Sequence, residues 1–194
     1  MGDGKRANRR GEGDVWKGLA AGLIGGLVAS WTMNRFQDVW MKLSEISEQS
    51  QGARDEQQGD GQNSGQGEQQ AKGGEEQDDT TVKAASAISE GIFDHELTKS
   101  EKKIAGSAVH YSLGTGVGGL YGAVAELAPE VTTGAGLPFG AAFWLVVDEG
   151  AVPLLGLSKG PTEYPLSTHA YALASHFVYG LTAETIRRAI RRAL

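Results

Sequence analysis

Glycine recurs at every fourth position in two apolar stretches of this sequence. The first series is Gly18, Gly22 and Gly26, and the second is Gly114, Gly118 and Gly122. Residues four apart share one face of an α-helix, and small residues there let two helix backbones approach closely in a membrane. In a water-exposed helix, each interior glycine would cost roughly 1 kcal/mol relative to alanine. The pattern therefore predicts two membrane helices that cross each other at these positions.

The second series overlaps the spelling of a nucleotide-binding turn. Residues 114–119 read GTGVGG, which satisfies G-x-G-x-x-G. A dinucleotide turn needs an apolar β-strand before the first glycine and an acidic residue about 20 positions later, after a second strand. Upstream of these residues, Thr98 and Glu101 have the spacing of a helix-capping box, and no strand-like run of β-branched residues follows. This context disfavours a nucleotide-binding protein.

A hydrophilic insert separates the two glycine series. Residues 44–80 are rich in Gln, Gly, Glu and Asp and contain almost nothing that a core could bury. Such a segment cannot offset its ordering entropy, so we expect a disordered loop. It divides the chain into a basic cytoplasmic tail (1–14), a first transmembrane helix with its flank (15–43), the loop (44–80) and a three-helix transmembrane region (81–194).

Four apolar stretches are the candidate membrane spans. They are residues 18–33, 104–127, 136–157 and 167–186, to be compared with the roughly 20 residues that a bilayer core requires. An even number of spans puts both termini on one side, and both ends of the chain are rich in arginine and lysine. The positive-inside rule places such ends in the cytoplasm. The formal net charge of the whole chain, −6, argues against nucleic acid as a partner.

Polar side chains inside these spans are the candidate functional residues. We expect an intramembrane polar network of His110, Asp148, Glu149, His169, His176 and Tyr179. The network either fixes which helices pack together or forms a proton or ion pathway, because histidines and carboxylates facing a bundle interior are the usual parts of relays. Asp148 and His176 are expected at similar depth and are predicted to pair. Two acidic residues at helix ends, Glu126 and Glu184, need no function on this interpretation.

Other chemistries find less support. His169 and His176 are about 10 Å apart along a helix, which is too far for them to share one metal ion. The chain has no cysteine, and no serine or threonine stands in a recognisable catalytic triad. We therefore expect no catalytic residue, no metal site and no cofactor, and a protein without enzymatic activity.

Three short motifs in the second half of the chain resemble one known family. LYGAVAELAP at 120–129, PLLGL at 153–157 and HFVYGLTAETIRR at 176–188 are similar to the YagU-like family of uncharacterised bacterial inner-membrane proteins. The likeness covers roughly residues 105–192. It implies a multi-span inner-membrane protein with no established biochemical activity and a loose association with acid tolerance.

Together, these features predict an all-α fold, a four-helix transmembrane bundle with a disordered hydrophilic loop between helices 1 and 2. The main functional hypothesis is a structural or partner-binding membrane protein. Its expected partners are the lipid bilayer and either another membrane protein or a second copy of the chain. The alternative hypothesis is a minimal proton or ion conduit linked to acid tolerance.

Overall fold

The computed structural model describes residues 3–58 and 80–194, with side chains described for residues 14–46 and 80–194. These residues form helices and connecting turns without a β-strand, so the predicted all-α class is confirmed for the described part of the chain. The chain divides into two compact units. Unit 1 comprises residues 1–33, 110–144 and 176–194, and unit 2 comprises residues 34–109 and 145–175.

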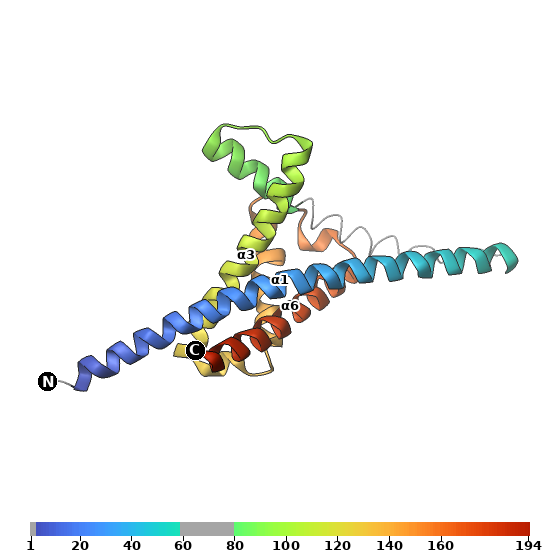
Figure 1. Cartoon of the computed structure of the whole chain (residues 1–194). Helices are drawn as coiled ribbons and strands as arrows, with labels where there is room; N and C mark the ends of the chain where they lie inside the picture. The colour runs from blue at the N-terminus through green and yellow to red at the C-terminus, as the bar shows by residue number, and fades with distance from the viewer. Residues whose placement is uncertain (1–2, 59–79) are drawn as a thin grey trace. The chain divides into compact units, whose positions relative to one another are not determined.

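Three long helices, labelled in Figure 1, contribute to both units. They are α1 (Asp3–Gln58), α3 (Lys99–Leu127) and α6 (Leu166–Ala193). Shorter elements connect them: a helix at residues 80–93, η1 (Pro129–Thr132), α4 (Leu137–Val146), the π-helical turn η2 (Val147–Ala151), α5 (Val152–Leu154) and η3 (Pro161–Glu163).

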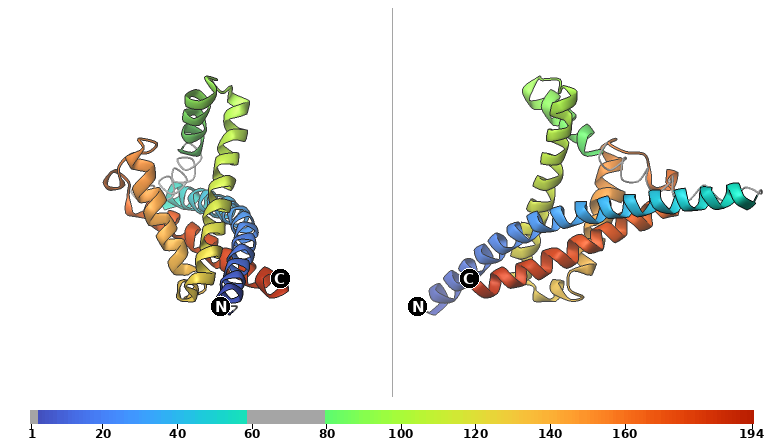
Figure 2. Two further views of the ribbon diagram at one scale, coloured as in Figure 1. Left: turned by 90° about the vertical axis from the view of Figure 1, so that its left-hand side faces the viewer. Right: turned by 45° about the vertical axis from the view of Figure 1, so that its right-hand side comes forward.

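The two glycine series meet in unit 1, where α1 crosses α3 (Figures 1 and 2). Gly22 faces the backbone of Gly118 and Gly122, and Gly26 faces that of Gly114 and Gly118. A Cβ added to Gly118 would lie 2.5 Å from the Gly26 Cα, closer than real Cβ contacts. The rising numbers on α1 match falling numbers on α3, so the two helices run antiparallel with backbone against backbone.

Glycine also shapes the contacts of α6 in unit 1. A Cβ added to Gly25 of α1 would lie 2.8 Å from the carbonyl oxygen of Ala183. On the other side, Gly136 and Gly140 approach Gly180, and a Cβ on Gly180 would lie 2.9 Å from the Gly140 nitrogen. Gly136 also has φ +87°, a backbone conformation that residues with a side chain rarely adopt. The turn before α4 therefore requires glycine both for its backbone angle and for its close contact with Gly180. Small residues therefore set the spacing at both faces of α6.

Unit 2 contains the start of α3 and the helix at residues 80–93. The predicted capping box is confirmed: the backbone N–H of Thr98 donates to Glu101 at 2.8 Å, and the Glu101 N–H donates to the Thr98 hydroxyl at 3.4 Å. In α3, Gly106 leaves room for Val82, whose Cγ2 would lie 2.8 Å from an added Cβ. Elsewhere in the unit, the rings of Trp40 and Tyr171 lie 6.0 Å apart, which joins α1 to α6.

The structure corrects the boundary of the hydrophilic loop predicted for residues 44–80. Residues 44–58 are the last part of α1, in keeping with the high helix propensity of Glu, Gln, Ala and Arg. Most of the remainder, residues 59–79, lies outside the described residues, so the disorder predicted there stays a prediction. Residue 80 already belongs to the next helix.

Within the third predicted span, residues 136–157, the chain is helical without a gap from Leu137 to Leu154 and includes a π turn. Pro153 has no N–H, and in a regular α-helix its ring would clash with the carbonyl of Glu149, four residues earlier. The helix widens just before it into the π turn η2, in which the Val152 N–H bonds the carbonyl of Val147. Among the described helices, one stretch, Leu137–Leu154, is long and apolar enough to cross a membrane by length and composition. The glycine, alanine and polar residues of α1, α3 and α6 make these helices less hydrophobic than a typical span.

The GTGVGG sequence lies in the middle of α3. Residues 114–119 are helical on both sides, and the segment from Lys99 to Leu127 offers no strand before the glycines and no turn at them. A dinucleotide-binding turn needs both features. The glycines serve the crossing with α1 instead.

Candidate functional site

An ionic cluster lies at one end of unit 1, where α1, α3 and the last turns of α6 meet. Glu184 is only 1% exposed, and three donors surround its carboxylate. The Tyr121 hydroxyl donates to it at 2.9 Å, Arg187 donates at 2.7 and 3.0 Å, and Arg188 donates through Nε. A buried carboxylate requires such pairing, because an unpaired charge in a low-dielectric interior is strongly unfavourable.

A second carboxylate extends the cluster across the helices. Arg191 of α6 donates to both oxygens of Glu126 on α3, at 2.7 and 3.0 Å, and to Asp14 on α1 at 3.1 Å. Arg187 also approaches Glu126, at 3.7 Å. The hydrogen bonds that Arg191 donates to Glu126 raise the pKa of Arg191 above its ordinary value. We call these residues the ionic cluster: Asp14, Tyr121, Glu126, Glu184, Arg187, Arg188 and Arg191.

Aromatic side chains fill the interior of unit 1 beside this cluster. The Tyr179 hydroxyl is buried and donates to the carbonyl oxygen of Gly114 at 2.6 Å. Phe143 lies edge-on to both Tyr179 and His176, with ring centroids 5.1 Å apart in each case. His176 is 2% exposed. These contacts join α3, α4 and α6, and they place two residues of the predicted polar network in a packed interior.

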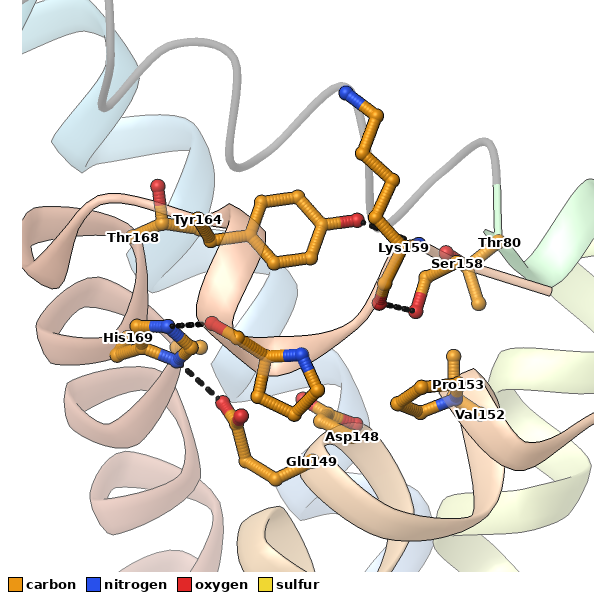
Figure 3. A pocket seen from close by; sticks show the side chains of 12 residues that line it. Thr80, Asp148, Glu149, Val152, Pro153, Ser158, Lys159, Tyr164, Thr168 and His169 are labelled. Atoms are coloured by element: carbon orange, nitrogen blue, oxygen red, sulfur yellow. Dashed lines mark hydrogen bonds and ion pairs between the residues drawn. The ribbon is translucent and has the colours of Figure 1, made fainter. Parts of the chain in front are cut away.

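The polar site of unit 2 is built by the widened helical turn that follows α4. The π turn at Val147–Ala151 presents Asp148 and Glu149 toward the first turn of α6, which carries Thr168 and His169 (Figure 3). π turns of this kind occur often at functional sites because they displace side chains from ordinary helical positions. The turn at residues 158–164 contributes the remaining side of this polar site.

His169 is held through both ring nitrogens. Its Nδ1 lies 2.6 Å from Glu149 Oε1, and its Nε2 lies 2.9 Å from the carbonyl oxygen of Pro161, as Figure 3 shows. The His169 and Glu149 side chains are 20% and 16% exposed, so water reaches the pair only in part. A histidine fixed at both nitrogens beside a carboxylate is suited to holding and exchanging a proton.

This pair lies at a cavity of about 90 Å³. A volume of this size holds a few water molecules or a small ion. The lining combines two carboxylates, a histidine, hydroxyl groups and an ammonium group with apolar side chains: Thr80, Asp148, Glu149, Val152, Pro153, Ser158, Lys159, Pro161, Tyr164, Thr168, His169 and Ala172. Within the described part of the chain, no three His, Asp, Glu or Cys side chains are grouped so that they could hold a metal ion.

The structure distributes the predicted polar network over both units. His110, His176 and Tyr179 belong to unit 1, and Asp148, Glu149 and His169 belong to unit 2. It brings His169 into contact with Glu149 and places Asp148 at the same cavity. The predicted pair of Asp148 and His176 is divided between the units and stays a prediction.

Sequence reasoning missed the extent of the ionic cluster. The local pairing of Glu184 with Arg187 and Arg188 follows from helical spacing, but Glu126 and Arg191 are 65 residues apart. The sequence contains one signal for this contact. The predicted span 104–127 has the acidic Glu126 at its end, and the predicted span 167–186 is followed by arginines that can pair with it.

Fold and site together describe a helical protein that buries charged and small residues at its helix contacts. The chain belongs to the DUF1440 family of proteins of unknown function, whose family model matches residues 87–185, just over half of the 194 residues. The motifs between residues 120 and 188 predict an uncharacterised family, and that part of the prediction is confirmed. No curated protein and no solved structure gives a significant match.

Proposed function

We propose that this chain is a multi-span protein of the bacterial inner membrane, related to the YagU-like proteins, with a structural or partner-binding role. In this proposal the helices of unit 1 form the membrane-embedded bundle, and both termini are cytoplasmic. The protein is not an enzyme and needs no cofactor, and its partner is a second membrane protein or a second copy of the chain.

The observation that carries the proposal is the distribution of side chains on α1. The buried residues follow a helical stripe and nearly all are small: Gly18, Ala21, Gly22, Gly25, Gly26, Ala29, Ser30 and Met33. The large apolar residues point outward, with Leu23, Ile24, Leu27 and Trp31 between 37% and 55% exposed. In water each such side chain would gain roughly 1.5–3 kcal/mol from burial, so the reverse distribution is unfavourable there. In lipid it is favourable, because acyl chains cover the outer face and small residues let the helices approach.

The same distribution recurs on α6. Phe177 and Leu181 are 37% and 47% exposed, whereas the polar residues His176, Glu184 and Arg187 of the same helix are each 7% exposed or less. Polar and ionisable groups in membrane proteins face the bundle interior and bind one another there. The exposed large apolar residues of both helices, with small residues buried on α1 and ionisable residues buried on α6, support a lipid environment for unit 1.

Contacts between the two ends of the chain support the proposed orientation. Lys17 donates to the carbonyl oxygen of Leu194 at 2.9 Å, and Arg191 binds Asp14, so the start of α1 in unit 1 lies beside the end of α6. These contacts support a topology in which both ends lie on the same side of a membrane. The positive-inside rule assigns that side to the cytoplasm.

Single-cysteine variants test the membrane environment, since the chain has no cysteine of its own. We expect spin labels at Leu27→Cys and Leu181→Cys, in lipid nanodiscs, to be relaxed by oxygen, which concentrates in lipid, and to be protected from a water-soluble nickel chelate. A label at Glu130→Cys, in the exposed turn η1, is the matched control and should respond to nickel. If labels at positions 27 and 181 respond to nickel as the control does, the bundle is not embedded in lipid.

The cavity in unit 2 favours a second candidate function, a proton or ion conduit. The pair of His169 and Glu149 joins two groups that exchange protons, next to space for water or a small ion. Liposomes that contain the protein should then dissipate an imposed pH gradient faster than empty vesicles, and His169→Gln should remove the difference. Equal rates with and without the protein would leave the structural role as the better assignment.

A further inference from the structure

His169 has a hydrogen-bond acceptor at each ring nitrogen. The carbonyl oxygen of Pro161 can only accept, so Nε2, 2.9 Å away, must carry a proton. A neutral imidazole then has no proton left at Nδ1, which lies 2.6 Å from the carboxylate of Glu149. Two acceptors do not approach so closely without a proton between them. Both hydrogen bonds can therefore form at once only when the pair carries one proton more than neutral histidine and ionised glutamate supply.

We infer that His169 and Glu149 form a proton-binding site, and that the bound proton fastens the turn at residues 158–164 to α6. With the proton bound, one N–H of His169 bonds Glu149 and the other bonds Pro161. When the proton leaves to water in the cavity, the single remaining N–H bonds the charged carboxylate, which is the stronger acceptor. The lone pair of Nε2 then faces the Pro161 oxygen, and the two repel each other. Loss of the proton releases the turn from α6.

Hydrogen bonds within residues 158–164 allow this turn to move as a unit when its contact with His169 changes. Its own hydrogen bonds hold it together: the backbone N–H of Lys159 donates to the Tyr164 hydroxyl at 3.1 Å, and the Gly160 N–H donates to Glu163 at 3.0 Å. The contact between Pro161 and His169 links it to α6. Losing this contact removes one link between the turn and α6, while the hydrogen bonds inside the turn are kept.

Other ionisable residues also line the cavity. The charged ones are Asp148, on the same π turn as Glu149, and Lys159 of the turn. Tyr164 stands edge-on to His169, with ring centroids 6.3 Å apart. The helix at residues 80–93 contributes Thr80 and α6 contributes Thr168, neither of which titrates. Proton binding here goes beyond the proposed function, since it requires no transport across a membrane.

A spin label in the turn tests the inference on the full chain in detergent. Thr162→Cys places the label on an exposed residue of η3, and Lys103→Cys places a control label on an exposed residue of α3. Over about pH 5 to 8, where histidine changes charge, we expect the label at 162 to move faster at the high end. The label at 103 should show no such change. A label at 162 with unchanged mobility across this range overturns the inference.

Substitutions in the pair identify the group that responds. His169→Gln cannot take up the proton and should abolish the pH response of the label at 162, whereas His95→Gln, at an exposed histidine, should preserve it. Glu149→Gln keeps the size of the side chain but removes its charge, so the response should shift to lower pH because the protonated imidazole loses its partner. Circular dichroism verifies that each variant is folded. A response that persists in His169→Gln, or a midpoint unchanged in Glu149→Gln, contradicts the inference.

Discussion

Substitution of Gly118 by alanine tests whether backbone contact holds α1 against α3. The added Cβ would lie 2.5 Å from Gly26 Cα and 2.8 Å from the Gly26 nitrogen, which are backbone atoms without freedom to turn aside. Gly116 lies on the same helix, and a Cβ there would meet nothing within 4 Å. Both substitutions add one methyl group to a glycine of α3. They differ only in the atoms that this methyl group meets.

The expected magnitude follows from the contact distance. Ordinary contacts between carbon atoms lie at about 3.5–4.0 Å, so the helices must separate by about 1 Å to accommodate the alanine. A gap of about 0.5–1 Å already loses a quarter to a half of the dispersion energy, and overpacking typically costs about 1–3 kcal/mol. Both variants gain the same helix propensity, about 1 kcal/mol, which cancels in the comparison. We expect Gly118→Ala to be about 1–3 kcal/mol less stable than Gly116→Ala.

Equilibrium unfolding in mixed micelles measures this difference. The fraction of a denaturing detergent in a mild one is raised stepwise, and helix content and tryptophan fluorescence are followed for both variants and the parent chain. Gly116→Ala should unfold at the same point as the parent or later. If the two variants unfold at the same detergent fraction, the glycines are not in close contact and the crossing described for α1 and α3 is wrong.

Two further predictions concern ionic groups. Glu184→Gln removes the nearer of the two carboxylates that pair with the buried Arg187 and should destabilise the fold by about 3–5 kcal/mol, whereas Asp38→Asn, which breaks an exposed pair, should cost about 1 kcal/mol or less; equal unfolding midpoints would refute the burial argument. Hydrogen bonds from Thr98 hold the pKa of Glu101 below its usual value, so its contribution to the start of α3 is present above the unfolded-state pKa and lost as pH falls through the folded one. A carboxyl titration by NMR checks this, and a midpoint at or above 4.5 would contradict it.

Short-range features of the fold are predictable from the sequence. The start of α3 depends on Thr98 and Glu101, three residues apart, and a capping box needs no other part of the chain. The glycine spacing indicates which face of a helix makes close contact, and the structure places Gly22 against Gly118 on those faces. The end of α1 is harder to predict from the sequence. Its polar residues, such as Glu and Gln, are typical of loops in composition, but they also have high intrinsic helix propensity.

Long-range contacts were not predictable in the same way. Gly25 is out of step with the four-residue series, and its role against α6 depends on a crossing that only the folded chain defines. Helical spacing reveals the pairing of Glu184 with Arg187, but not that Tyr121 of α3 covers the same carboxylate. The contact of His169 with Glu149 depends on a π turn, whose extra residue shifts every later side chain around the helix axis.

The repeat of glycine every four residues has a consequence for the register between α1 and α3. Sliding one helix along the other by four residues, about 6 Å, would bring glycine opposite glycine again, so the crossing alone specifies its register weakly. The ionic cluster removes this ambiguity, because Arg191 binds Asp14 on α1 and Glu126 on α3 at the same time. Only one alignment of the two helices offers both carboxylates to a single guanidinium group. Arg191 therefore fixes the register of α1 relative to α3.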